Sequence, residues 1–200
     1  MVTAVAACTA YQLKITLLET LPPIWRRFVV PVDITLDRLD RVIQSVMGWE
    51  DRHLHQFTIQ GLRFMNPRRN LIMLNPFCKI RDERRTKLNT LVSEVGVSFL
   101  YEYDFTGGPW RHKVELEKIF GRRINGLKLL AGERDCPPED CGGPAGYEEL
   151  LQAVRNGQQP KRKAMIKWLE GYALMSEVFD KDYVRQDLLE LEELWFGESR

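Results

Sequence analysis

Residues 11–31 read YQLKITLLETLPPIWRRFVVP, and this stretch decides the class of the fold. In its first half an apolar side chain falls at every second position, which is typical of a strand with one buried face. These residues are Tyr11, Leu13, Ile15 and Leu17. After the break at LETLPP, the segment IWRRFVVP predicts a second strand with Ile24, Phe28 and Val30 on one side. The stretch therefore predicts a β-hairpin with a long loop.

A helix and further strands follow the hairpin. Thr35 is the expected N-cap of the helix, and Gly48 is its expected end. Between them apolar residues recur at helical spacing, namely Leu36, Leu39, Val42, Ile43, Val46 and Met47. Alternating patterns then predict strands at 53–59, 98–105 and 111–119, the last two joined by the turn TGGP. We expect residues 66–87, which are rich in Arg and Lys, to form a loop with one short strand.

The pattern changes from strands to helices after Gly121. The loop and helix start CPPEDCGGPAGYEELL, residues 136–151, lead into the first of three expected helices, at 147–154, 163–175 and 181–195. Strands first and helices later favour the α+β class. We expect a β-grasp-like mixed sheet with one packed helix, followed by a C-terminal helical part. The predicted organisation is a single domain with a flexible N-terminus at 1–10, a sheet core at 11–120, and the loop and packed helices at 121–200.

The composition narrows the classes of function. The chain has 29 Lys and Arg against 28 Asp and Glu, and its net charge of +1 creates no general attraction to nucleic acid or membranes. No apolar run approaches the length of a membrane span, and the N-terminus lacks the basic start of a signal peptide. Two of the four cysteines are isolated in sequence, which does not fit a secreted disulfide framework. We therefore expect a cytoplasmic protein with no membrane partner.

Histidine and cysteine residues form the first candidate site. Each of the three histidines lies at the start of a predicted strand, on the side that the apolar residues occupy. Two close cysteines lie in the loop after the sheet. Together they could bind zinc through thiolate and imidazole ligands. The candidate ligands are His53, His55, His112, Cys136 and Cys141. The alternative is that the histidines lie at the edge of the core and bond to backbone or to a carboxylate such as Asp104.

The two thiols allow two further interpretations. Cys136 or Cys141 could be a nucleophile, since the helix that opens near Tyr147 offers a partial positive charge. Glu139 and Asp140 oppose this, because neighbouring negative charges raise a thiol pKa. The loop could instead set the angle between sheet and helices through its Pro and Gly residues.

Basic side chains at 66–87 form a second candidate site, for phosphate or nucleic acid. The candidate contacts are Arg68, Arg69, Arg81, Arg84, Arg85 and Lys87. The alternative is a solvated loop. The sequence contains no P-loop, dinucleotide fingerprint, HExxH motif or nucleophile elbow. We therefore predict no catalytic residue and no cofactor, with zinc as the alternative.

The ordered motifs of the chain resemble those of the plasmid open-reading-frame-three-like family, which is also labelled an insertion-element passenger. The resemblance spans most of the chain and rests on five segments. They are PPIWRRFVVP at 22–31, ITLDRLDRVIQSVMGW at 34–49, HLHQF at 53–57, YDF with WRHKVELEK at 103–118, and LAGERDCPPEDCGGPAGYEELL at 130–151. Two features depart from the family: TGGP at 106–109 replaces an acidic turn, and residues 66–87 are basic where relatives are often acidic.

The resemblance implies the same α+β fold and brings no activity. From the residues themselves we expect a binding or interaction module, associated with mobile elements or nucleic acid, whose partner is a protein or a nucleic acid. The alternative is a zinc-binding or thiol-dependent enzyme that uses Cys136, Cys141 and the histidines. The recombinase label of some relatives finds no support, because no activated serine among arginines is present.

Overall fold

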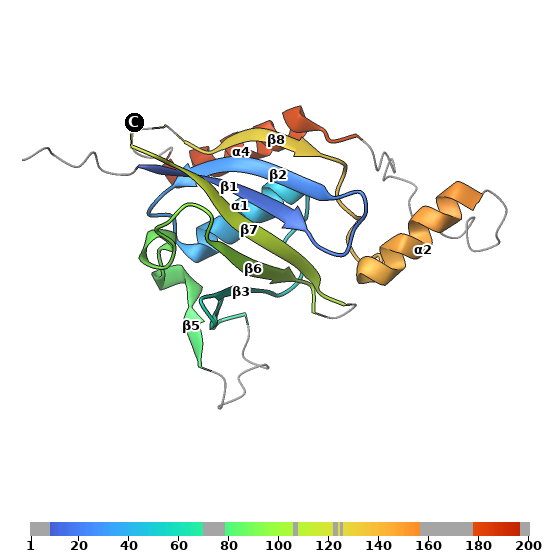
Figure 1. Cartoon of the computed structure of the whole chain (residues 1–200), viewed down its shortest axis with the longest axis horizontal. Coiled ribbons are helices and arrows are strands. Elements are labelled where there is room, and N and C mark those ends of the chain that lie inside the picture. The colour runs from blue at the N-terminus through green and yellow to red at the C-terminus, as the bar shows by residue number, and fades with distance from the viewer. Residues whose placement is uncertain are drawn as a thin grey trace, which may run out of the picture.

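A mixed sheet with helices on one of its faces forms the body of the described structure, and a further helix extends away from it (Figure 1). The computed structural model describes residues 9–69, 79–105, 108–121, 124, 126–156 and 178–196. The strands are β1 (Ala10–Leu17), β2 (Ile24–Pro31), β3 (His55–Ile59), β4 (Leu62–Met65), β5 (Ile80–Asp82), β6 (Ser98–Tyr103), β7 (Trp110–Phe120) and β8 (Lys128–Glu133). The helices are α1 (Leu36–Met47), α2 (Gly143–Asn156) and α4 (Lys181–Phe196), with short 3₁₀ turns η1 (Glu83–Arg85) and η2 (Leu88–Thr90).

The strands lie in the order β5-β4-β3-β6-β7-β1-β2-β8, and all neighbours are antiparallel except β4 and β5. The hairpin of β1 and β2 pairs Leu13 with Phe28, as the alternating pattern predicts. The α+β class is therefore confirmed, while the β-grasp-like detail stays a prediction. The strand β8 was not predicted, and it extends the sheet beyond residue 120.

The core lies between the sheet and α1. The alternating residues of β1 and β7 and the apolar stripe of α1 are buried, including Leu13, Ile15, Ile43 and Val114 at 0% exposure. The helix begins after Thr35 and ends at Gly48, whose φ of 90° is the left-handed conformation that glycine adopts easily. Both ends agree with the sequence prediction.

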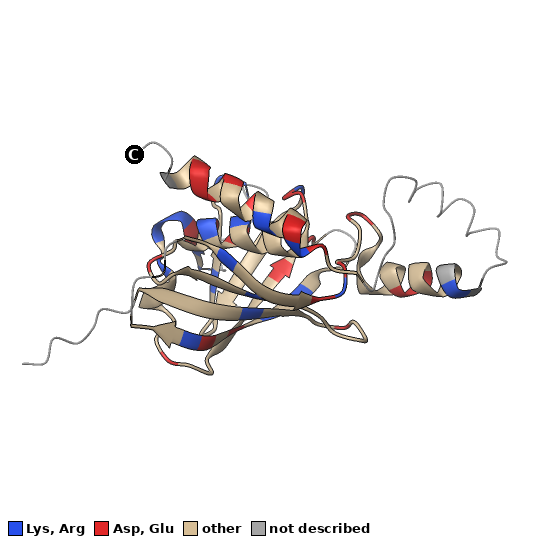
Figure 2. Cartoon of the chain, turned by 90° about the horizontal axis from the view of Figure 1, so that it is seen from above, with Lys and Arg blue, Asp and Glu red and all other residues tan. Residues whose placement is uncertain are grey.

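The C-terminal helices are placed differently from each other. The helix α4 lies on the same side of the sheet as α1, where Val184 and Leu188 are buried, and Figure 2 shows the opposite side of the sheet without a described helix. The helix α2 begins where Tyr147 contacts Trp110, with ring centroids 6.3 Å apart, and runs away from the sheet (Figure 1). The helix expected at 163–175 lies outside the described residues.

No helix within the described ranges is both long and apolar enough to span a membrane.

Candidate metal centre

The three histidines lie on the core side of the sheet, in three different environments. His112 on β7 is fully buried, and its Nδ1 lies 3.2 Å from the carbonyl oxygen of Tyr101. Its ring packs against that of Trp49 in a T-shaped arrangement, with centroids 5.1 Å apart. Burial lowers the pKa of His112 to about 3. The residue is therefore a neutral part of the core at physiological pH.

His55 on β3 lies between two buried carboxylates. Its Nε2 is 2.8 Å from Glu83 Oε2, and its Nδ1 is 3.2 Å from Asp40 Oδ1. Burial by itself lowers the pKa of His55, but Asp40 and Glu83 outweigh burial and raise the pKa above its ordinary value. Burial raises the pKa of Asp40 to about 6, although His55 and the hydroxyl of Tyr101 act in the opposite direction.

His53 precedes β3 and lies among three carboxylates near the surface. Its Nε2 is 2.9 Å from Asp140 Oδ1 and 3.6 Å from Glu139 Oε2, and its Nδ1 is 3.6 Å from Asp104 Oδ1. The candidate ligand atoms of His53, Asp104 and Asp140 all lie within 4.8 Å of one another. We call His53, Asp104, Glu139 and Asp140 the His53 cluster.

The His53 cluster is assembled by backbone that other residues hold in place. Asp104 follows β6, and its N–H donates to the carbonyl of Leu54 at 3.0 Å. Glu139 accepts from the hydroxyl of Tyr103 at 2.9 Å and from the N–H of Glu50 at 3.0 Å. These bonds bring the loop after β8 and the end of β6 to the same end of the sheet.

Backbone conformation and charge mark the His53 cluster as unusual. Asp104 and Asp140 have φ values of 57° and 56°, in the left-handed region that few residues other than glycine adopt. One imidazole can carry at most one positive charge, and Glu139 and Asp140 bring two carboxylates to the same ring nitrogen, Nε2. Within the described residues, neither Glu139 nor Asp140 forms an ion pair with Lys or Arg. The cluster therefore has an excess of negative charge beside a histidine.

The two cysteines stand next to this cluster rather than in it. Cys136 and Cys141 are half-buried free thiols. Burial raises the pKa of Cys136 well above its ordinary value and that of Cys141 to about 12. Both are thus protonated at neutral pH, which counts against the nucleophile interpretation. Neither of the two groups of close potential ligands found among the described residues includes a cysteine or His112.

Most of the basic candidate contacts are engaged with acidic neighbours. Arg69 donates to Asp51 at 2.6 Å, and Lys87 to Asp33 at 3.2 Å. Arg84 pairs with Asp82 at 2.7 Å, and Arg85 lies 3.9 Å from the same carboxylate. Arg68 and Arg81 are exposed. Ion pairing within the chain reduces the positive potential that phosphates would meet. Residues 70–78 of this segment lie outside the described residues.

Sequence reasoning identified the histidines but missed most of the carboxylates. Asp40 is four positions after Leu36, on the core-facing stripe of α1. A charged residue at a buried position indicates a partner or a site, and this signal could have identified Asp40 from the sequence. Asp51 and Asp140 carry no comparable local signal. They reach the histidines only through the turns of the folded chain.

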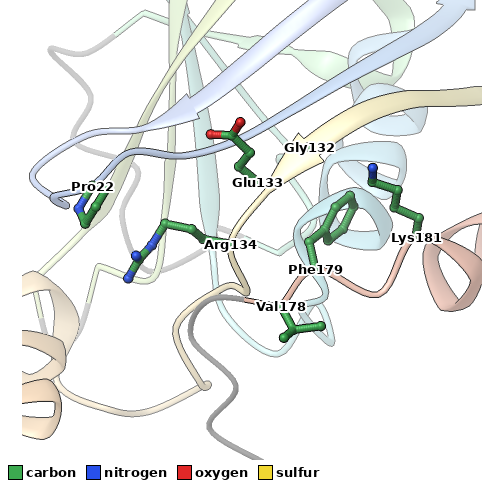
Figure 3. A pocket seen from close by; sticks show the side chains of 7 residues that line it. All are labelled: Pro22, Gly132, Glu133, Arg134, Val178, Phe179 and Lys181. Carbon is green, nitrogen blue, oxygen red and sulfur yellow. The ribbon is translucent and has the colours of Figure 1, made fainter. Parts of the chain in front are cut away.

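A separate pocket of about 590 Å³ opens between β8 and the start of α4 (Figure 3). It is lined by Pro22, Gly132, Glu133, Arg134, Val178, Phe179 and Lys181. The carboxylate of Glu133 accepts from the indole N–H of Trp25 at 3.0 Å. None of the lining residues belongs to the His53 cluster.

The fold and the cluster together define an α+β protein with histidine and carboxylate side chains at one end of a mixed sheet. The model of the plasmid pRiA4b ORF-3-like proteins matches residues 9–187, and the chain belongs to this family. This confirms the resemblance that the sequence motifs indicate.

Two relatives support the assignment. The uncharacterized protein y4hQ of Sinorhizobium fredii is 36% identical over 159 residues, which cover 78% of this chain and 79% of that protein. The crystal structure of MM3350 from Methanosarcina mazei Go1, a protein of unknown function, is 31% identical with a TM-score of 0.74. The match covers 88% of this chain and 97% of that one. The relatives bring a family and a fold, but their names state no activity.

Proposed function

We propose that the protein is a binding module for a divalent metal ion, and that the His53 cluster is its site. The observation that carries the proposal is the position of the His53 imidazole within 3.6 Å of three carboxylates. Metal ligands must be deprotonated, and ligand carboxylates are held by further hydrogen bonds. The hydroxyl of Tyr103 supplies such a bond to Glu139.

The ligand types select the kind of metal. One imidazole nitrogen with carboxylate oxygens suits Mn²⁺, Fe²⁺ and Zn²⁺, whereas Mg²⁺ and Ca²⁺ prefer oxygen alone. The zinc hypothesis from the sequence is thus kept in altered form. Carboxylates of the CPPEDC loop, rather than its thiols, would approach the histidine. Asp140 is the most open ligand, with 55% of its side chain exposed, so a bound ion would be reachable from solvent.

The broader prediction of an interaction module agrees with a metal-binding role. Contact with nucleic acid is less well supported, because four of the basic candidates, Arg69, Arg84, Arg85 and Lys87, lie against acidic side chains. An association with mobile elements is supported only by the plasmid origin of the family name.

Metal titration of the chelator-treated protein tests the proposal. We expect calorimetry with Mn²⁺ and with Zn²⁺ to show binding that His53→Gln and Asp140→Asn each weaken by more than roughly 100-fold, since changes beyond the ligands themselves already cost about 10–100-fold. The matched control is Asp182→Asn, which removes an aspartate that is 92% exposed on α4.

The control should bind as the parent does. Equal affinities for the parent, His53→Gln and Asp140→Asn would contradict the proposal, as would a parent that binds neither ion below about 1 mM, the strength of the weakest specific sites.

A further inference from the structure

A second group of potential ligands surrounds His55, away from the His53 cluster. The candidate ligand atoms of Asp40, Asp51 and His55 all lie within 4.8 Å of one another. They come from α1, from the turn after α1 and from β3. His55 is 4% exposed and Asp40 is 2% exposed, so this group is enclosed by the protein.

The two ring nitrogens of His55 have unequal partners. Nε2 is hydrogen bonded to Glu83 at 2.8 Å, and Glu83 is 1% exposed. Because a carboxylate accepts, Nε2 carries a proton in this bond. Nδ1 is buried and has no hydrogen-bond partner with acceptable geometry among the described residues, although Asp40 Oδ1 lies 3.2 Å away. In the neutral ring, the lone pair of Nδ1 is therefore directed toward carboxylate oxygens. A cation placed between Nδ1 and these oxygens would be attracted to both.

Histidines that bind metals usually donate their second N–H to a carboxylate, which fixes the tautomer and the orientation of the ring. Glu83 stands in that position relative to His55. The carboxylates of Asp40 and Asp51 are likewise held by hydrogen-bond donors from other residues. Tyr101 donates its hydroxyl to Asp40 at 2.7 Å, while Arg69 and Arg41 approach the two oxygens of Asp51 at 2.6 Å and 2.9 Å. The group has both the ligands and the outer partners of a metal site.

Charge points in the same direction. The guanidinium groups of Arg41 and Arg69 already compensate Asp51. With a neutral imidazole, the three carboxylates of Asp40, Asp51 and Glu83 face these two guanidinium groups, and one negative charge is left without a counter-charge. Buried charge without compensation is costly. A divalent ion on Nδ1, with Nε2 still bonded to Glu83, would supply positive charge to this group.

We propose that Asp40, Asp51 and His55 form a second, buried site for a divalent transition-metal ion such as Zn²⁺ or Mn²⁺, with Glu83 as the residue that orients the imidazole. This site goes beyond the proposed function, because it is a separate site in which His55 and Asp40 are buried. Such an ion would tie α1 to β3 and η1, and its role would be structural.

Removing the sites one at a time tests the second site. We take the double variant His53→Gln, Asp140→Asn, strip it with chelator and titrate it with Zn²⁺. We expect one equivalent to bind, and we expect the further change Asp40→Asn to abolish it. Loss of all binding in the double variant would overturn the buried site and leave the His53 cluster as the metal site. If instead the parent and the double variant bind the same single equivalent, and Asp40→Asn removes it, the buried site stands and the proposed function falls.

A milder variant covers the case in which Asp40→Asn does not fold. Glu83→Gln keeps a hydrogen-bond acceptor for His55 and removes only the charge. In the double-variant background we expect Glu83→Gln to weaken Zn²⁺ binding by about 10–100-fold with an unchanged circular dichroism spectrum. Glu94→Gln is the matched control, because Glu94 is exposed in the turn before β6. Unchanged affinity in folded Glu83→Gln would overturn the proposal.

Discussion

The environment of each histidine decides its protonation: the pKa of His55 is raised, whereas that of His112 is lowered. His53 and His55 lie against carboxylates. The ring of His112 instead packs against Trp49 and is hydrogen bonded to the backbone carbonyl of Tyr101. The pKa of His112 is lowered to about 3 by burial. His112 is thus not a ligand candidate, because its ring is buried and neutral.

The pKa of His112 predicts how stability changes with pH. The unfolded state takes up this proton near pH 6.5 and the folded state only near pH 3. The contribution of His112 is therefore complete above pH 6.5 and is lost as the pH falls toward 3. The slope is at most about 1.4 kcal/mol per pH unit. In His112→Asn, which keeps an N–H donor but cannot be protonated, we expect a flatter acid limb in urea unfolding with chelator present.

The comparison between parent and variant isolates His112. Asp40, whose pKa is raised to about 6, acts in the opposite direction, because its contribution is present at low pH and is lost as the pH rises through 6. Asp40 is present in both proteins, so subtracting the two stability profiles removes its effect. Parallel profiles between about pH 7 and pH 4 would show that His112 is not held neutral in the fold.

At the scale of elements, the contact between β8 and the segment before α4 requires a glycine at position 132, which has no side chain. A Cβ added to Gly132 would lie 2.6 Å from Cε1 of Phe179 and 2.7 Å from Cδ of Arg26. Arg26 is buried and donates through Nε to the carbonyl of Val46 at 2.8 Å, so it has little room to move. Gly132 therefore lets the segment before α4 pack against β2 and β8.

We expect Gly132→Ala to lower the free energy of unfolding by roughly 1–3 kcal/mol, the usual cost of overpacking. Chemical denaturation measures this value. The matched test is the same change in a Phe179→Ala background, where part of the clash is gone and the cost should be smaller. An equal cost in both backgrounds would mean that Phe179 is not what the new methyl group meets.

The elements that sequence analysis predicted are those with a local pattern. β1 and β7 each bury every second side chain over most of their length, and α1 buries a continuous stripe. β8 buries only Leu129 and pairs with β2 at the edge of the sheet. Its sequence therefore has no alternation of apolar and polar residues from which the strand could be predicted. The same reasoning applies to the two kinds of residue in the proposed metal sites. His55 and His112 lie on strands with an alternating pattern, but Asp104 and Asp140 approach His53 only in the folded chain.

At the scale of the whole molecule, the loop at 136–142, between β8 and α2, joins segments that lie far apart in the sequence. Trp49, which follows α1, donates its indole N–H to the carbonyl of Pro137 at 3.1 Å, and Glu50 donates its N–H to Glu139. The end of α1, the end of β6 and the loop after β8 are thus joined at the His53 cluster. The family match from residue 9 to 187 covers all three segments. The ion proposed for the His53 cluster would contact residues before β3, after β6 and after β8, so its binding should stabilise the fold.

Whether the chain is a single domain, as predicted from the sequence, can be tested at α4. Leu188 on α4 is 2% exposed and belongs to the same core cluster as Ile43 of α1 and Val114 of β7. We expect Leu188→Ala to cost about 2–5 kcal/mol, as large-to-small core changes do, and to destabilise the sheet together with the helix. Hydrogen exchange by mass spectrometry should then show faster exchange by the same factor in peptides from β1, β7 and α4.

The control is Leu194→Ala, at a position that is 76% exposed, which should leave exchange in the sheet unchanged. Faster exchange confined to α4 in Leu188→Ala would contradict the single domain, since it would mean that this helix opens without the sheet.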